Sequence, residues 1–182
     1  MTVLVLVGSL RAGSTNARLA DVAIGALPVD NTVTRWERLT ELPFYSEDLD
    51  TDAAPAIVGE FRDVVAAADA LLVVTPEYNG SLPAILKNAI DWASRPRGAA
   101  AIAGLPAAVL AASGSPRAAL WAREDAVKVL RVAGALPLAE TVGIGSAWSA
   151  FEGGRLVDPT QEHAVHELMG ALVAAARVHV TA

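Results

Sequence analysis

Short continuous runs of apolar residues punctuate this chain. Three of them, rich in valine, leucine and alanine, predict strands buried on both faces: Val3–Val7, Ala70–Thr75 and Pro106–Ala112. Two weaker runs, Thr32–Arg38 and Leu138–Ile144, predict a second and a fifth strand in chain order. The sequence therefore predicts five strands, three of them central.

Segments with helical spacing separate the strands. They predict helices at Asn16–Leu27, Ala56–Ala68, Leu82–Ser94, Arg117–Ala133 and from Asp158-Pro159 to about Arg177. Capping signals support their ends, with Ser14 or Thr15 before the first helix and Gly134 after the fourth. Phe151–Val157, with Gly153-Gly154 at its middle, predicts a small hairpin.

The alternation of strands and helices determines the expected fold class. Parallel strands joined by right-handed crossovers form a sheet that helices cover on both faces. We therefore expect an α/β fold with a doubly wound five-stranded parallel sheet in the order 2-1-3-4-5. The sequence has no evident linker, repeat or low-complexity tract, so residues 1–182 are expected to form a single domain.

Composition narrows the classes of function. An apolar fraction of 53% with 19% charged residues is typical of a folded chain. The net charge of −6, without a basic block, argues against nucleic acid or an anionic membrane as partner. The absence of cysteine excludes disulfides and thiolate chemistry, so any redox activity requires a bound cofactor. With no signal peptide or membrane-spanning run evident, we expect a cytoplasmic protein.

The loop after the first strand, Gly8–Asn16, has the composition of a phosphate site. Small residues allow a tight turn there, and a helix N-terminus follows with unpaired N–H groups. Its candidate ligands are Ser9, Arg11, Ser14, Thr15 and Asn16. The loop lacks the glycine patterns of the Walker A and Rossmann sites, so a single terminal phosphate fits better than a pyrophosphate. The alternative is a plain turn whose serine and asparagine cap the helix.

Two further loops follow the third and fourth strands. In Thr75–Pro83, the Asn79-Gly80 pair permits positive φ and turns backbone N–H groups outward, which suits a planar heteroaromatic ring. The candidates for contact with such a ring are Pro76, Glu77, Tyr78, Asn79 and Gly80. The third loop, Ala112–Arg117, contributes Ser113 and Gly114. Either loop on its own is also compatible with an ordinary turn.

The predicted strand order makes the three loops neighbours. Ligands of doubly wound sheets bind at the carboxyl ends of strands near the switch point. Two strand spacings cover about 10 Å, which is close to the length of a flavin ring system.

Four segments of the chain resemble motifs of a known family. The segments Gly8-Ser9-Leu10-Arg11 to Ala20, Leu42–Asp50, Pro76–Trp92 and Ser94-Arg95-Pro96 are similar to motifs of the NAD(P)H-dependent FMN reductases, a flavodoxin-like group of quinone, chromate and azo reductases. The resemblance implies FMN as cofactor and NADPH or NADH as co-substrate. It also implies a small-molecule acceptor such as a quinone, azo compound, chromate or free flavin, and a homodimer or homotetramer.

The resemblance also distributes the candidate residues. The first loop would hold the FMN phosphate, the second would line the isoalloxazine ring, and Ser113 and Gly114 would close the far side. The chain departs from the family where Ala118-Ala119 replaces a frequent Gly-Gly pair, which puts access to the ring in question. No catalytic side chain is assigned, because hydride transfer to a flavin needs no acid at its first step.

Two other readings of the sequence remain. The chain could be a non-enzymatic FMN electron carrier, or a binding module that uses the first loop for a phosphorylated ligand. His163 and His166 lie on one helix face, but no third ligand is identifiable, so we expect no metal site.

Overall fold

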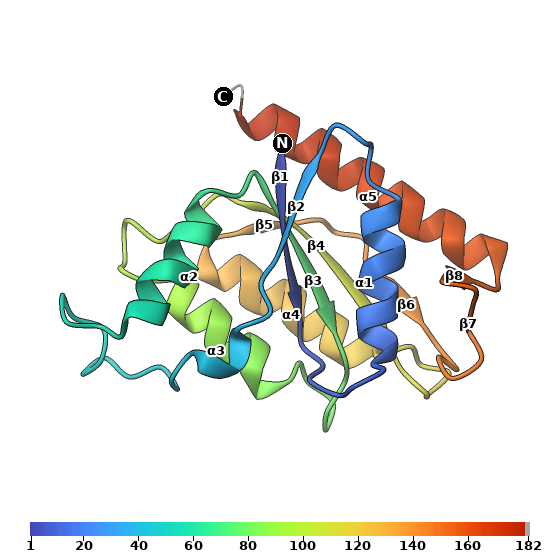
Figure 1. Ribbon diagram of the computed structural model, residues 1–182, viewed down its shortest axis with the longest axis horizontal. Coiled ribbons are helices and arrows are strands. Elements are labelled where there is room, and N and C mark those ends of the chain that lie inside the picture. Colours follow the sequence, from blue (N-terminus) through green and yellow to red (C-terminus); the bar gives the residue numbers. More distant parts are fainter. Residues whose placement is uncertain (181–182) are drawn as a thin grey trace.

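A parallel sheet forms the centre of the structure, a computed structural model that describes residues 1–180 (Figure 1). Its strand order is β2-β1-β3-β4-β5, which is the predicted order 2-1-3-4-5. The strands are β1 (Thr2–Val7), β2 (Thr32–Arg35), β3 (Ala70–Thr75), β4 (Pro106–Ala112), β5 (Leu136–Pro137) and β6 (Val142–Ile144). The sequence thus predicts both the fold class and the central strands.

Helices cover both faces of the sheet. On one face lie α1 (Thr15–Gly25) and α5 (Pro159–Val180), and on the other lie α2 (Ala56–Ala66), α3 (Ala84–Ala93) and α4 (Leu120–Ala133) (Figure 1). The short helix η1 (Leu39–Glu41) follows β2, and the predicted hairpin is present as β7 (Phe151–Glu152) and β8 (Arg155–Leu156).

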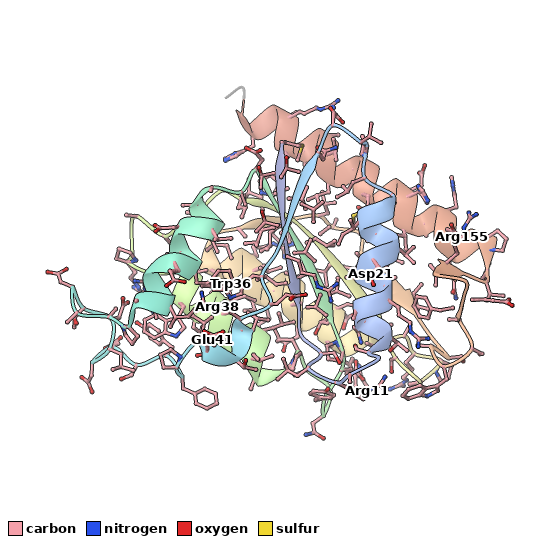
Figure 2. All side chains as sticks on the ribbon, viewed as in Figure 1. Arg11, Asp21, Trp36, Arg38, Glu41 and Arg155 are labelled. Carbon is pink, nitrogen blue, oxygen red and sulfur yellow. The ribbon has the colours of Figure 1, made fainter. Side chains whose placement is uncertain are left out.

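Alternating side chains of the buried strands supply the two halves of the core. In β1, Val3 and Val5 face α1 and α5, whereas Leu4 and Leu6 face the other three helices. All four are at most 2% exposed. The edge strand β2 is only partly buried and ends at Arg35 rather than at the predicted Arg38. Beyond it, Arg38 forms ion pairs with Glu41 and Glu60; Arg38 and Glu41 are labelled in Figure 2. The hydrogen bond from Arg38 holds the pKa of Glu41 below its usual range.

The fifth position of the sheet differs from the single predicted strand Leu138–Ile144. Two short strands occupy it: β5 pairs with the start of β4 and β6 pairs with its end. Between them, Arg123 of α4 donates hydrogen bonds to the carbonyl and hydroxyl oxygens of Thr141. Thr141 is therefore bonded to α4 at the point where the strand is interrupted.

Helix starts also differ from the sequence pattern. The third helix begins at Ala84 rather than Leu82, because Pro83 is its N-cap with an extended backbone. The fourth begins at Leu120 rather than Arg117, because Ala118 and Ala119 both have φ of 53°, outside the right-handed helical region.

Candidate functional site

The three loops singled out in the sequence meet at one edge of the sheet. Strands β1, β3 and β4 are adjacent and parallel, so their carboxyl ends lie together, at the lower edge in Figure 1. The labelled Arg11 lies at this edge in Figure 2. We call residues 8–16 loop one, residues 76–83 loop two and residues 113–119 loop three.

Loop one has a row of unused backbone donors. Within the part of the chain that the structure describes, the N–H groups of residues 9 to 13 donate to no acceptor. Gly13, with φ of 67°, turns the loop towards the start of α1. Ser14 caps that helix by accepting from the N–H groups of Asn16 and Ala17, at 3.1 and 3.3 Å. Consecutive free N–H groups beside a helix N-terminus are the donor set that binds a phosphate.

Asn16 has a different task from its predicted one. Its side chain is 3% exposed and points into the protein, where Nδ2 donates to the carbonyl of Ala112 at 2.9 Å. Asn16 Oδ1 accepts from the N–H of Ala112 at 2.8 Å. Because Ala112 ends β4, Asn16 fastens loop one to loop three. The structure therefore makes it a positioning residue rather than a group that faces a ligand.

Loop two forms a tight projecting turn. The backbones of Tyr78 and Ser81 bond to each other in both directions, and Asn79 and Gly80 between them have φ of 53° and 77°. The N–H groups of Glu77, Asn79 and Gly80 find no acceptor within residues 1–180. Tyr78 beside them is 55% exposed. The turn thus offers backbone donors and an aromatic side chain at the same edge.

Two side chains tie loop two to α4. Glu77 Oε2 accepts from the N–H of Ala122 at 3.1 Å, and Ser81 Oγ donates to Asp125 at 2.5 Å. Ala122 is in the first turn of α4, so the Glu77 carboxylate satisfies a donor that the helix leaves unpaired. This contact agrees with a structural role for Glu77 rather than that of a general base.

Glu77→Ala is expected to lower the free energy of unfolding by about 1 kcal/mol, since comparable helix caps contribute roughly 0.5–2 kcal/mol. Glu77→Gln keeps an oxygen acceptor and should lose less. Urea unfolding of both variants measures the difference. Equal stability of the alanine variant and the wild type would show that the contact contributes nothing.

Loop three follows β4 and is bonded to β6 and the segment after it. Ser113 donates its N–H to Ile144 at 2.9 Å and its Oγ accepts from Ser115, while the N–H of Gly114 has no acceptor among the described residues. Arg123 supports the loop from beneath by donating to the Ala118 carbonyl at 3.1 Å. Burial lowers the pKa of this arginine, although Glu124 and Glu77 oppose the shift.

The left-handed backbone of Ala118 and Ala119 explains why glycine suits these positions. The Ala119 side chain is fully buried beside Ala111 and Ala122, so its methyl group does not narrow the open edge. Ala118 is only half-buried. Alanine in place of glycine at these positions therefore costs backbone strain, of about 1–2 kcal/mol for each alanine.

Ala118→Gly is expected to raise the free energy of unfolding by about 1 kcal/mol and the melting temperature by roughly 2–4 °C. Ala126→Gly, inside α4, is the matched control and should lower both, because glycine weakens a helix interior. Thermal and urea unfolding test the pair. A loss of stability in Ala118→Gly would refute the strain argument.

The sequence pattern gave no structural reason for Asn88, which holds the segment after β2. Its Oδ1 accepts from the Tyr45 N–H at 2.8 Å, and its Nδ2 donates to the Pro43 carbonyl at 2.9 Å. Trp92 Nε1 donates to the same carbonyl at 2.7 Å. Phe44, within the clamped segment, remains 79% exposed. The sequence signal for this contact was an asparagine and a tryptophan four residues apart, which places both on one face of the predicted helix.

The donors of this edge fit FMN. Its phosphate presents only acceptors at neutral pH and matches the free N–H groups of loop one, with Ser9 and Arg11 beside them. Its ring presents carbonyl and nitrogen acceptors, which match the free N–H groups of loop two and Gly114. Within residues 1–180, no group of three acidic or histidine side chains is placed to hold a metal ion. Over the same range, no helix combines the length and apolar character that crossing a bilayer requires.

Comparisons with known proteins identify similar enzymes. An NAD(P)H-dependent FMN reductase of Pseudomonas aeruginosa is 39% identical over 172 residues, covering 93% of this chain and 92% of that protein. A 2-hydroxy-1,4-benzoquinone reductase of a Burkholderia species is 43% identical over 113 residues, 62% of this chain and 61% of that one.

A solved structure and a family model also match this chain. The NAD(P)H:acceptor flavoenzyme FerB of Paracoccus denitrificans superposes with a TM-score of 0.87 at 32% identity and 98% coverage of both chains. The model of the family described as NADPH-dependent FMN reductase matches residues 1–149. The chain therefore belongs to this family and is an oxidoreductase that uses FMN as cofactor and NAD(P)H as co-substrate.

Proposed function

We propose that this chain is a quinone reductase that takes its electrons from NAD(P)H through FMN held at the carboxyl edge of the sheet. The free backbone donors of three adjacent loops are the observation that supports the site most directly. Relatives named as quinone and benzoquinone reductases support the choice of acceptor. Azo compounds, chromate and free flavin are the alternative acceptors.

Each loop has its own part in the proposed site. Loop one binds the phosphate through its N–H groups, and loop two orients the ring through backbone donors and the Tyr78 side chain. Gly114 of loop three supplies a backbone donor on the far side, at a position where an added Cβ would clash with Trp148. The proposed cofactor-contacting residues are Ser9, Arg11, Ser14, Thr15, Pro76, Glu77, Tyr78, Asn79, Gly80, Ser113 and Gly114. When bound, FMN supplies the ring that accepts hydride from NAD(P)H and passes two electrons on.

The loops favour an enzyme over an electron carrier. An electron carrier would cover its flavin and surround it with acidic residues. Loops one and three instead contribute Arg11 and Arg117, which form no ion pair within residues 1–180. The carboxylate of Glu77 accepts a hydrogen bond from the backbone of α4. Such an edge leaves room for a second, anionic substrate such as NAD(P)H.

Two measurements on one preparation test the function. Protein reconstituted with FMN should shift the flavin absorbance and then oxidise NADPH or NADH in the presence of a benzoquinone. Binding of FMN without quinone-dependent oxidation of either nucleotide would contradict the reductase. Absence of FMN binding at micromolar concentration would contradict the site itself. An acceptor panel under steady-state conditions then ranks quinones against azo compounds and chromate.

We propose that the protein is a homodimer or homotetramer. Several apolar side chains at the carboxyl edge are exposed, including Phe44 at 79%, Leu10 at 61% and Trp121 at 49%. A cofactor and a second copy of the chain would cover this surface. Light scattering is expected to give at least twice the 18.8 kDa of one chain. A monomer mass throughout the micromolar range would rule the oligomer out.

We further propose a cytoplasmic location and a small molecule, not nucleic acid, as partner. The net charge of −6 supports the second part, since nucleic acid would be repelled. A gel-shift assay with duplex and single-stranded DNA at low salt tests it, with no retardation expected.

A further inference from the structure

A fourth loop reaches the same edge beside loop three. Residues 145–150 follow β6, and the N–H of Ala147 donates to the carbonyl of Ser113 at 3.0 Å. The N–H of Ser113 in turn donates to Ile144. These two backbone bonds hold the fourth loop against loop three. They therefore fix the backbone next to Trp148, which follows Ala147.

Trp148 spans the space from loop three to loop one. A Cβ atom placed on Gly114 would lie 2.4 Å from its Nε1 and 3.1 Å from its Cε2, so the indole lies directly on the Gly114 backbone. Over the ring stands the guanidinium of Arg11, with Cζ 5.3 Å from the ring centroid. One side chain thus contacts two of the three loops that fit the cofactor.

The high exposure of Trp148 argues against a role in the core. It is 72% exposed, whereas Trp92 is fully buried. Nor does Arg11 have another strong partner: its only side-chain hydrogen bond is to Ala12 at 3.5 Å, and it forms no ion pair within residues 1–180. Among the described residues its charge therefore has no ion-pair partner, and its guanidinium packs against the indole.

An exposed arginine has many rotamers, and binding an anion through it normally costs the entropy of ordering them. A guanidinium already stacked on an indole has lost part of that freedom, and the stacking leaves its N–H groups free at the edge of the plane. The FMN phosphate, expected at the neighbouring N–H groups of loop one, then meets a cation that is already in place.

We propose that Trp148 is a positioning residue for the FMN phosphate, acting through Arg11 from a fourth loop of the site. The inference rests on the proposed FMN site. It differs from that proposal in assigning a residue outside the three loops. Because the effect passes through the phosphate, it should not extend to riboflavin, which has the same ring and no phosphate.

Fluorescence titration with FMN and with riboflavin tests the proposal. Trp148→Ala should weaken FMN binding about two- to fivefold, the change that corresponds to an exposed cation–π contact, and leave riboflavin binding unchanged. Trp148→Phe keeps an aromatic face and should restore most of the FMN affinity. Trp121→Ala is the matched control. Trp121 also stacks on an arginine, with the Arg117 Cζ at 4.6 Å, but any loss there should be equal for the two flavins.

A double-mutant cycle adds the decisive readout. In an Arg11→Ala background, Trp148→Ala should change FMN affinity by less than about 1.5-fold, because the pair acts as one unit. Three results would overturn the proposal: equal losses for FMN and riboflavin, no loss or a gain for FMN, or a full effect that persists without Arg11. If wild-type protein fails to bind FMN, the proposed function falls first. If it binds and any of the three results is found, only the role of Trp148 falls.

Discussion

Replacing Asn16 with alanine is expected to lower the free energy of unfolding by about 2–4 kcal/mol. Both polar atoms of this side chain are bonded to the backbone of Ala112, in a site where Asn16 is 3% and Ala112 is 2% exposed. The alanine variant leaves a buried N–H and a buried carbonyl without partners, and each such group costs roughly 1–3 kcal/mol. Urea unfolding followed by circular dichroism measures the loss.

The same substitution should also weaken flavin binding, and without regard to the phosphate. Asn16 fastens loop one to the end of β4, so its loss separates the phosphate side of the site from the ring side. FMN and riboflavin affinities are then expected to fall together. Asn31→Ala is the matched control, because that side chain donates only to Pro28 and Asp30 in its own turn. An Asn16→Ala protein as stable as this control would show that the two bonds are not needed.

The sequence predicts the framework of this protein because its central strands are unambiguous. Each of β1, β3 and β4 is a continuous apolar run, and such runs occur where both faces of a strand are covered. Once those strands alternate with helices, handedness and strand order follow from general rules. The three loops were located for the same reason, since each begins where a buried strand ends.

What the sequence does not predict depends on contacts between distant residues. Asn16 has a side-chain amide that could bind a phosphate. Only the position of Ala112, 96 residues away, shows that this amide is hydrogen-bonded within the protein. The left-handed Ala118 and Ala119 look helical, because alanine favours helices. At the split fifth strand, Thr141 is bonded to a partly buried arginine from α4, and no local pattern near Thr141 indicates that contact.

Arg11→Ala is expected to weaken FMN binding about ten- to a hundredfold. A hydrogen bond to a charged group contributes roughly 1.5–3 kcal/mol, and each 1.4 kcal/mol corresponds to a tenfold change in affinity. Arg11 lies among the free N–H groups of loop one, those of residues 9 to 13, and has no carboxylate partner among the described residues, so its charge is available to the phosphate. The loss should exceed that of Trp148→Ala, because Trp148 only orders the group that Arg11 itself supplies.

Riboflavin separates this explanation from a general loosening of the site. It has the same ring and lacks the phosphate, so its affinity should barely change in Arg11→Ala, in contrast to Asn16→Ala, where both flavins lose. The titrations need one fixed salt concentration, because an exposed charge interaction is screened by ions. Equal losses of FMN and riboflavin would mean that Arg11 supports the ring site or the loop. Unchanged affinity for both would leave the phosphate to the N–H groups and hydroxyls of loop one, since these donors remain when the guanidinium is removed.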